Sequence, residues 1–147
     1  MNTDCRNQSG VTLVELLVVV AIIGIIGAVS GLFLLKYLPE YHLRAAATTL
    51  SQDLRQAQVG AIRRLEPWSV TMNTATQSYR IEGPIGTVIK TVNLSSYDGD
   101  IQFTAVSGSP IQFNEEGFAT SGNATMRNSR GSLLTIQVLR TGVVRVQ

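Results

Sequence analysis

The sequence is organised around Ser9-Gly10-Val11-Thr12-Leu13-Val14-Glu15-Leu16-Leu17, because a long apolar run begins where this stretch ends. No charged residue occurs in the twenty positions from Leu16 to Leu35, which are mainly Val, Ile, Leu, Ala and Gly. A helix rises about 1.5 Å per residue, so the run is long enough to cross the roughly 30 Å hydrocarbon core of a bilayer. Glu15 stands at the entrance of the run. Because ionisable groups in membrane segments are costly, this carboxylate is a candidate functional residue.

The polar leader before this run differs from a secretory signal. Such signals place a positive segment before a short apolar region and are cut beyond it at small residues. Here the apolar run is longer than usual, and Lys36-Tyr37-Leu38-Pro39 follows it without such a site. We therefore expect the helix to be retained as a single-pass membrane anchor. Its orientation is not decided by charge, since Arg6 and Lys36 flank the run on opposite sides.

Leader and run together resemble the N-terminus of type IV pilin-like proteins. Those chains carry a leader ending in Gly and a helix beginning Phe-Thr-Leu-Ile-Glu-Leu, and a prepilin peptidase cuts after the Gly and methylates the new N-terminal amine. The resemblance implies a leader over residues 1–10, cleavage between Gly10 and Val11, and N-methylation of Val11. It also implies an assembly role for Glu15, which would be the fifth mature residue. Val11 and Val14 replace the family's Phe and Ile but keep both positions apolar.

Glu15 admits two interpretations. It could be a carboxylate that only reaches to the membrane surface. The resemblance instead implies that it pairs with the N-terminal amine of a neighbouring subunit, where opposite charges attract strongly in a low dielectric. A glutamate beside twenty uncharged residues favours the second interpretation.

Glycines within the apolar run predict close helix packing. Gly24 precedes a Gly-x-x-x-Gly pair formed by Gly27 and Gly31. Small residues let helix backbones approach where hydrophobicity cannot drive association. Glycine is also simply common in membrane helices. Because pilin-like helices bundle in the fibre core, the resemblance favours a packing role.

An amphipathic helix is expected over residues 39–66, after a membrane half over 11–38. Pro39 should bend the helix without ending it, because helical periodicity resumes at once. Apolar residues then recur at three- and four-residue steps: Leu43, Ala46, Ala47, Leu50, Leu54, Ala57, Ala61, Ile62 and Leu65. Polar residues fill the remaining arc: Arg44, Gln52, Asp53, Arg55, Gln56, Arg63 and Arg64. We expect one face to cover a sheet and the other to meet water or neighbouring subunits, up to a stop at Pro67.

The remainder of the chain, residues 67–147, reads as short strands separated by turns. Candidate strands cover 68–72, 78–82, 87–94, 101–106 and 111–113. A closing hairpin follows over Leu134–Val146, with a turn assisted by Gly142. A β-meander packed on the amphipathic helix would cover both apolar faces. The expected class is α+β with the pilin-like fold, a long N-terminal helix on an antiparallel β-rich head, the globular domain being about 41–147.

The head carries a second resemblance, to the GspH/FimT group. Leu54-Arg55-Gln56-Ala57-Gln58-Val59-Gly60-Ala61 is similar to that group's Leu-x-x-Ala-Arg-x-x-Ala pattern, with Gln58 in place of Arg. Phe113-Asn114-Glu115-Glu116-Gly117 resembles its Phe-x-x-x-Gly block. The resemblance implies a minor pseudopilin of type II secretion or a minor type IV pilin, a structural fibre subunit. It would sit in the inner membrane with a periplasmic head, and its partners would be other pilin subunits, the prepilin peptidase and the inner-membrane assembly platform.

The sequence contains few residues that could support enzymatic chemistry. His42 is the only histidine and Cys5, in the leader, the only cysteine, so neither a catalytic triad nor a metal-binding pair is suggested. Asp98-Gly99-Asp100 resembles a fragment of a calcium loop, but Asp-Gly is first of all a turn. No phosphate-binding loop or dinucleotide fingerprint occurs. We expect no enzyme activity, no cofactor and no metal, and calcium at the Asp98-Gly99-Asp100 turn is kept as a minority alternative.

The end of the chain is rich in arginine. Arg127, Arg130, Arg140 and Arg145 all follow the last acidic residue, and they could form a surface that meets phosphates. Some fimbrial members of the group that this chain resembles bind DNA for uptake through a Gly-Arg-x-Arg motif. Gly142-Val143-Val144-Arg145 keeps only its second arginine, and four arginines are ordinary for a solvated face. A DNA-binding minor pilin is therefore an alternative that we do not favour.

A second alternative comes from another class of protein. The same anchor could carry a periplasmic binding domain unrelated to fibres. Cleavage after Gly10 separates this alternative from both fibre hypotheses, because an ordinary anchor keeps its N-terminus. DNA binding separates the two fibre hypotheses from each other.

Overall fold

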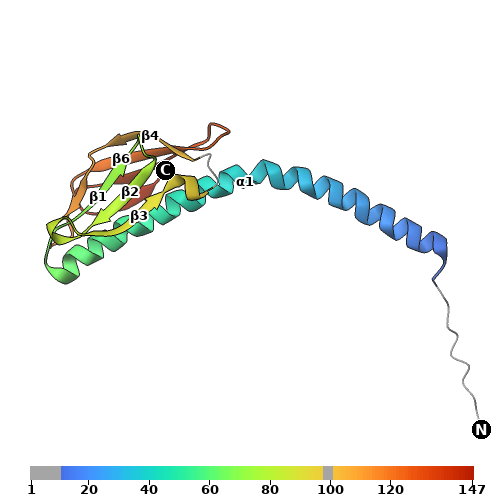
Figure 1. Ribbon diagram of the computed structural model, residues 1–147, viewed down its shortest axis with the longest axis horizontal. Helices are drawn as coiled ribbons and strands as arrows, with labels where there is room; N and C mark the ends of the chain where they lie inside the picture. Colours follow the sequence, from blue (N-terminus) through green and yellow to red (C-terminus); the bar gives the residue numbers. More distant parts are fainter. Residues whose placement is uncertain (1–10, 98–100) are drawn as a thin grey trace, which may run out of the picture. The chain divides into compact units, whose positions relative to one another are not determined.

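The computed structural model of the chain describes residues 11–97 and 101–147 (Figure 1). The predicted leader with Gly10 and the Asp98-Gly99-Asp100 turn lie outside the described residues. The chain divides into two units, Met1–Tyr37 and Leu38–Gln147, each of which is described by itself. One helix, α1 (Leu13–Arg64), contributes to both units and continues through Pro39.

In the first unit, α1 is long and apolar enough to cross a membrane. The stretch Leu13–Gly31 has a mean hydropathy of 2.7, and none of it is buried within the chain. The helix begins at Leu13 because Thr12 caps it: the backbone N–H of Glu15 donates to Thr12 Oγ1 at 3.2 Å. This segment therefore has a defined start and an apolar surface with no partner inside the described chain.

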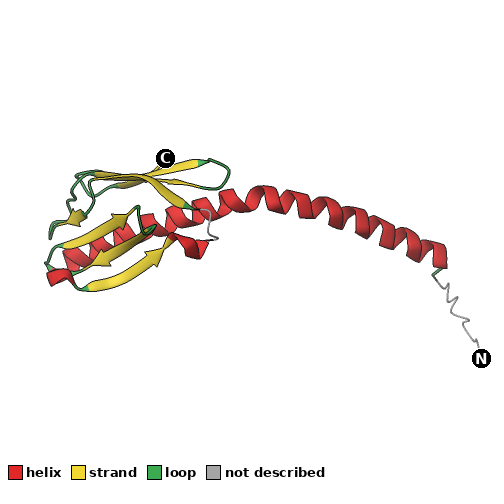
Figure 2. Ribbon diagram, turned by 45° about the horizontal axis from the view of Figure 1, so that its top comes forward, coloured by secondary structure: helices red, strands yellow, loops and turns green. Residues whose placement is uncertain are grey.

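The second unit contains two four-stranded antiparallel sheets beside the C-terminal part of α1 (Figures 1 and 2). Sheet A has the strand order β3-β2-β1-β5, and sheet B the order β4-β6-β7-β8. Sheet A consists of β1 (Trp68–Asn73), β2 (Ser78–Glu82), β3 (Val88–Asn93) and β5 (Ile111–Phe113). Sheet B consists of β4 (Gln102–Ser107), β6 (Gly122–Arg127), β7 (Leu133–Val138) and β8 (Val144–Val146). The short 3₁₀ turns Pro84–Gly86 and Leu94–Tyr97 flank β3. The α+β class with a long N-terminal helix and an antiparallel head is confirmed.

The expected β-meander is wrong, because the chain changes sheets three times, first between β3 and β4. It leaves β4 in sheet B, adds β5 to the edge of β1 in sheet A, and returns to place β6 beside β4. Glycines make this crossing possible: a Cβ on Gly122 would lie 2.7 Å from the Ser107 carbonyl oxygen, and one on Gly108 (φ +69°) would collide with the Ser121 carbonyl. Backbone thus packs on backbone where the strands exchange sheets. Strand β6 itself was not predicted, since its opening Gly122-Asn123 favours turns over strands.

The closing hairpin is confirmed. Strands β7 and β8 pair antiparallel, and the turn between them is closed by Leu139 N–H donating to the Val143 carbonyl at 3.0 Å. Gly142 has φ +77°, a conformation that favours glycine. The turn therefore follows from one residue type at one position.

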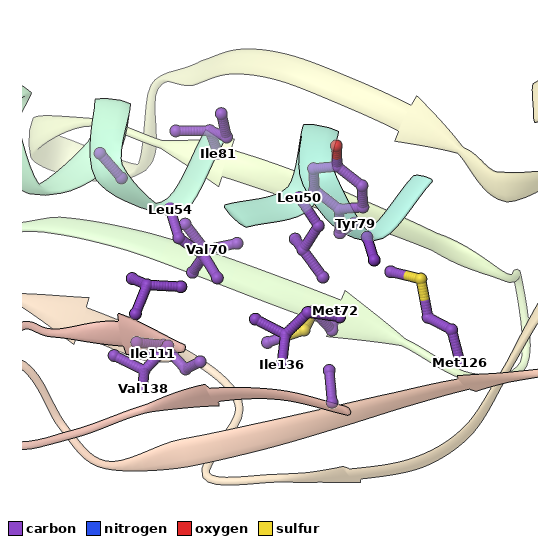
Figure 3. Packing of buried hydrophobic residues seen from close by; sticks show 14 of the residues in the cluster. Leu50, Leu54, Val70, Met72, Tyr79, Ile81, Ile111, Met126, Ile136 and Val138 are labelled. Carbon is purple, nitrogen blue, oxygen red and sulfur yellow. The ribbon is translucent and has the colours of Figure 1, made fainter. Parts of the chain in front are cut away.

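Side chains from α1, sheet A and sheet B meet in one core (Figure 3). The helix contributes seven buried residues that the periodicity predicted: Leu43, Ala46, Ala47, Leu50, Leu54, Ala57 and Ala61. Burying a leucine of this kind is worth about 1.5–3 kcal/mol. Two other residues expected on this face are largely exposed. Ile62 lies at the margin of the buried stripe, and Leu65 follows the last helical residue with φ +54°.

Asp53 was expected on the water-facing arc of α1 but is only 4% exposed. Its carboxylate accepts a hydrogen bond from the Tyr79 hydroxyl at 2.6 Å and two from Lys90 Nζ at 2.8 and 2.9 Å. The buried charge is therefore paired and hydrogen-bonded to both β2 and β3. Burial first, and then the bond to Asp53, raise the pKa of Tyr79 well above its ordinary value, so this hydroxyl stays protonated.

Candidate functional site

The predicted assembly residues lie at the start of α1. Val11 is 72% exposed, and Glu15 is in the first helical turn. Counting from the Thr12 cap, Glu15 is the third helical residue, so Thr12-Leu13-Val14-Glu15 has the Ser/Thr-x-x-Glu order of a capping box. An acidic residue here also interacts favourably with the helix dipole. Glu15 thus has a helix-capping role available within its own chain, a signal that the sequence analysis did not use.

The three glycines of the apolar run lie on one side of the helix. At 100° per residue, Gly24, Gly27 and Gly31 fall within an arc of about 60°. A Cβ added at any of them would meet nothing within 4 Å. No contact in the described chain requires glycine at these positions.

The four tail arginines are all exposed but do not form one surface. Arg127 and Arg130 lie at the end of sheet B that carries the β6–β7 turn, beside a polar pocket of about 360 Å³. Arg145 lies on β8 opposite Gln137 of β7, whereas Arg127 lies opposite Leu133 of the same strand. The two arginines are therefore displaced along the strand direction by four residues, or about 13 Å. Arg140 follows β7 at the opposite end of the sheet. The structure therefore separates them into two pairs.

Three residues that carry the motifs of the head converge around α1. The Gln58 Nε2 group donates a hydrogen bond to the Gly117 carbonyl at 2.8 Å. A Cβ on Gly142 would collide both with Gln58 and with that same carbonyl. Gly117 (φ +86°) and Gly142 (φ +77°) are both left-handed. Gln58 therefore joins α1 to the turns after β5 and after β7, and this contact leaves no room for a side chain at Gly142, whereas a Cβ at Gly117 would meet Ile62 at 2.8 Å.

A groove of about 650 Å³ lies along the exposed side of α1 near its C-terminal end. Its arginines were expected on a polar arc of the helix, but a groove was not predicted. We call it the α1 groove, and the residues that define it are Arg55, Val59, Gly60, Arg63, Arg64 and Trp68. The signal that could have found it is the spacing of three of them by four residues, with a tryptophan directly after the helix.

Trp68 forms the wall of the α1 groove and is 6% exposed. Its indole lies directly on Gly60, where a Cβ would come within 2.8 Å of the ring, and the Arg64 guanidinium carbon lies 5.7 Å from the ring centroid. Indole Nε1 is buried and has no acceptor within the described residues. A buried donor left unpaired costs about 1–3 kcal/mol. The groove wall therefore contains a donor that an external acceptor could satisfy.

Metal chemistry has no support in the described parts of the chain. Within residues 11–97 and 101–147, no three His, Cys, Asp or Glu side chains gather closely enough to hold an ion. Asp53, the buried carboxylate of the head, is already used by Lys90 and Tyr79.

Two family models match the chain. The prokaryotic N-terminal methylation motif covers residues 5–31, and the type II transport protein GspH covers residues 46–142. Comparison with curated protein sequences gives no match. The first model spans the predicted leader junction and the apolar run. The second spans the C-terminal part of α1 and every strand of the two sheets except β8.

Solved structures share the fold. The minor pseudopilin EpsH from the type 2 secretion system of Vibrio cholerae superposes with a TM-score of 0.60 at 13% identity, covering 72% of this chain and 96% of that one. The type IV minor pilin FimU of Pseudomonas aeruginosa superposes with a TM-score of 0.59 at 12% identity, covering 76% and 92%. Together with the two family models, which span most of the described residues, these findings establish that the chain belongs to the GspH family and is a minor pseudopilin or minor pilin whose methylation motif implies processing by a prepilin peptidase.

Proposed function

We propose that this chain is cut between Gly10 and Val11 and enters a pilus-like fibre through the first turn of α1. The new N-terminal amine of Val11 and the carboxylate of Glu15 on a neighbouring subunit would form the pair that sets the axial register. The observation that carries this proposal is Glu15 itself, the single charge in the helical stretch Leu13–Gly31, whose mean hydropathy is 2.7. Val11, with 72% of its surface exposed, is open to such a partner.

The apolar part of α1 has a second task in this proposal. Before assembly it would hold the chain in the inner membrane as a single pass, with the β-rich head in the periplasm. Within the fibre, the arc formed by Gly24, Gly27 and Gly31 would meet helices of other subunits. The open space beside these glycines supports this role, since small residues allow close approach of a second backbone. The assembly platform and the peptidase would act on this same segment.

The experiment compares Glu15→Gln with Glu15→Ala in cells that supply the peptidase and the other fibre subunits. Glutamine can still complete the capping box but carries no charge, whereas alanine loses both properties. We expect both variants to be cleaved after Gly10 and to remain in the membrane. We expect both to enter fibres at least about fivefold less than the wild type, because an unpaired amine is costly in low dielectric.

Glu116→Gln is the matched control, since it removes an exposed carboxylate from a turn of the head. It should be cleaved and incorporated as the wild type is. Wild-type incorporation of Glu15→Gln together with loss in Glu15→Ala would assign Glu15 to helix capping and contradict the charge-pairing mechanism. An intact N-terminus under conditions that process a control pilin would reject the fibre assignment of the leader.

A further inference from the structure

The α1 groove carries positive charge that the chain does not neutralise. Two basic side chains outside the groove have acidic partners: Arg44 pairs with Glu40 at 2.7 Å, and Lys90 pairs with Asp53. In the part of the chain that the structure describes, none of the three groove arginines forms an ion pair. The groove therefore presents guanidinium groups that are free to meet an anion from outside.

The spacing of these groups fits an elongated partner. Arg55, Val59 and Arg63 succeed one another by four residues along one stripe of α1. At 1.5 Å per residue, the two arginines stand about 12 Å apart along the axis. Val59, 49% exposed, lies between them. An apolar centre with charged ends is the usual composition of a protein interface, and two carboxylates seven or eight residues apart on a second helix would match it.

Trp68 favours a carboxylate as the group that is recognised. Guanidinium forks bind carboxylates through two parallel hydrogen bonds, and an indole N–H can donate to the same kind of oxygen. Nε1 of Trp68 is buried without an acceptor among the described residues, and the Arg64 guanidinium carbon lies 5.7 Å from the centroid of the same ring. The ring itself is flat against Gly60 and buried, so it offers no face on which a nucleotide base could stack. Both features favour an acidic protein segment over a nucleic acid.

We propose that the α1 groove is a docking surface for an acidic helix of a neighbouring pilin-like subunit. The identity of that occupant rests on the proposed function, whereas carboxylate recognition by the groove does not. Arg55 and Arg63 bind the two carboxylates, and Val59 packs between them. The contact adds an attachment on the head that is separate from the pairing at Val11 and Glu15.

Trp68 is the only tryptophan of the chain, so its fluorescence reports on this groove alone. The full-length chain in non-ionic detergent is titrated with an alanine-based helical peptide of about 16 residues. The peptide carries two glutamates about eight residues apart, which matches the spacing of Arg55 and Arg63 along α1. The control peptide has glutamines in their place. We expect a saturable change with the glutamate peptide, weakened by added salt, and little change with its glutamine twin. Affinity should fall about tenfold in Arg55→Gln/Arg63→Gln.

Arg127→Gln/Arg145→Gln is the matched control, because it removes the same charge from sheet B and should bind as the wild type does. The proposal is overturned by an equal response to both peptides, by no saturable response, or by undiminished binding in the groove variant. Displacement of the peptide by duplex DNA at a lower concentration would also overturn it. A chain that enters fibres but ignores the peptide refutes only the docking surface. A chain that binds the peptide but is never cut after Gly10 refutes only the proposed function.

Discussion

The two units of the chain use apolar residues in opposite ways. From Leu13 to Gly31 nothing is buried, and a Cβ added at its glycines would meet empty space. In Leu38–Gln147, by contrast, α1 and two sheets enclose a continuous core, and several glycines are pressed against backbone or rings. The side chains of the head are explained by contacts inside the chain. Those from Leu13 to Gly31 have no such contacts among the described residues, which agrees with the membrane and fibre surroundings proposed for this segment.

The largest difference between the two units is expected when one apolar side chain is shortened in each of them. Leu54 is fully buried, whereas Ile23 is 63% exposed. Leu54→Ala should lower the free energy of unfolding of the head by about 2–5 kcal/mol, through lost burial and the cavity that remains. Ile23→Ala should leave it within about 0.5 kcal/mol of the wild type. Chemical unfolding in detergent, followed by Trp68 fluorescence, measures both.

A loss in Ile23→Ala as large as that in Leu54→Ala would contradict the separation of the units. It would mean that the stability of the head depends on the apolar segment before it. Equal, small effects in both variants would instead contradict the core described for the head.

Glycines test the same contrast with a smaller change. Gly142→Ala adds a Cβ that collides with Gln58 and Gly117 at φ +77°, whereas Gly86→Ala adds one at φ +72° in open space. Both variants strain the backbone by about 1 kcal/mol. Only Gly142→Ala should lose about 1–3 kcal/mol more, because the overpacked contact must open. Gly27→Ala should not destabilise the head but should reduce incorporation into fibres.

The three variants are compared by the unfolding measurement used for Leu54→Ala. Equal losses in Gly142→Ala and Gly86→Ala would show that strain alone, and not the contact with Gln58, makes glycine necessary at the β7–β8 turn.

The smallest predicted effect concerns pH. In the folded head the pKa of Tyr79 is raised above its ordinary value of 10.0. The stability linked to this group is therefore complete below pH 10 and is lost as the pH rises above it, since only the unfolded chain then ionises this hydroxyl. Tyr79→Phe should cost about 1 kcal/mol at pH 7, through the bond lost to Asp53. It should lose less stability than the wild type between pH 9 and 11. Parallel curves for the two proteins would disprove the assignment.

Local sequence signals predicted much of this fold. The spacing from Leu43 to Ala61 identified the buried stripe of α1, and Gly142 identified the turn of the closing hairpin. Both depend on residues within a few positions of each other, which is the range over which periodicity and turn preferences act. The start of the first unit was defined in the same way, by the leader, Glu15 and the uncharged run.

Contacts between residues far apart in the sequence could not be predicted from local sequence patterns. Asp53 looked like a surface residue because its partners, Tyr79 and Lys90, are 26 and 37 positions away. Strand β5 lies in sheet A although the strands before and after it, β4 and β6, lie in sheet B. This placement depends on close backbone contacts at Gly108 and Gly122 that no local sequence pattern predicts. The α1 groove was missed for a different reason: its residues are close in sequence, but periodicity alone assigns the arginines to a solvated face and does not show that Trp68 packs over Gly60.

The core of the head can be completed only after almost the whole chain has been synthesised. Its core draws on nearly the whole second unit, from Leu43 on α1 to Val144 on β8. Synthesis runs from the N-terminus, so the apolar stripe of the helix emerges first and its covering strands follow. At roughly 5–20 residues per second, the interval between the first and last core residue is about 5–20 s. Throughout that time the stripe is open to other chains. A chain interrupted before β7 therefore lacks two of the strands that cover this stripe, and part of the apolar face of the helix stays exposed.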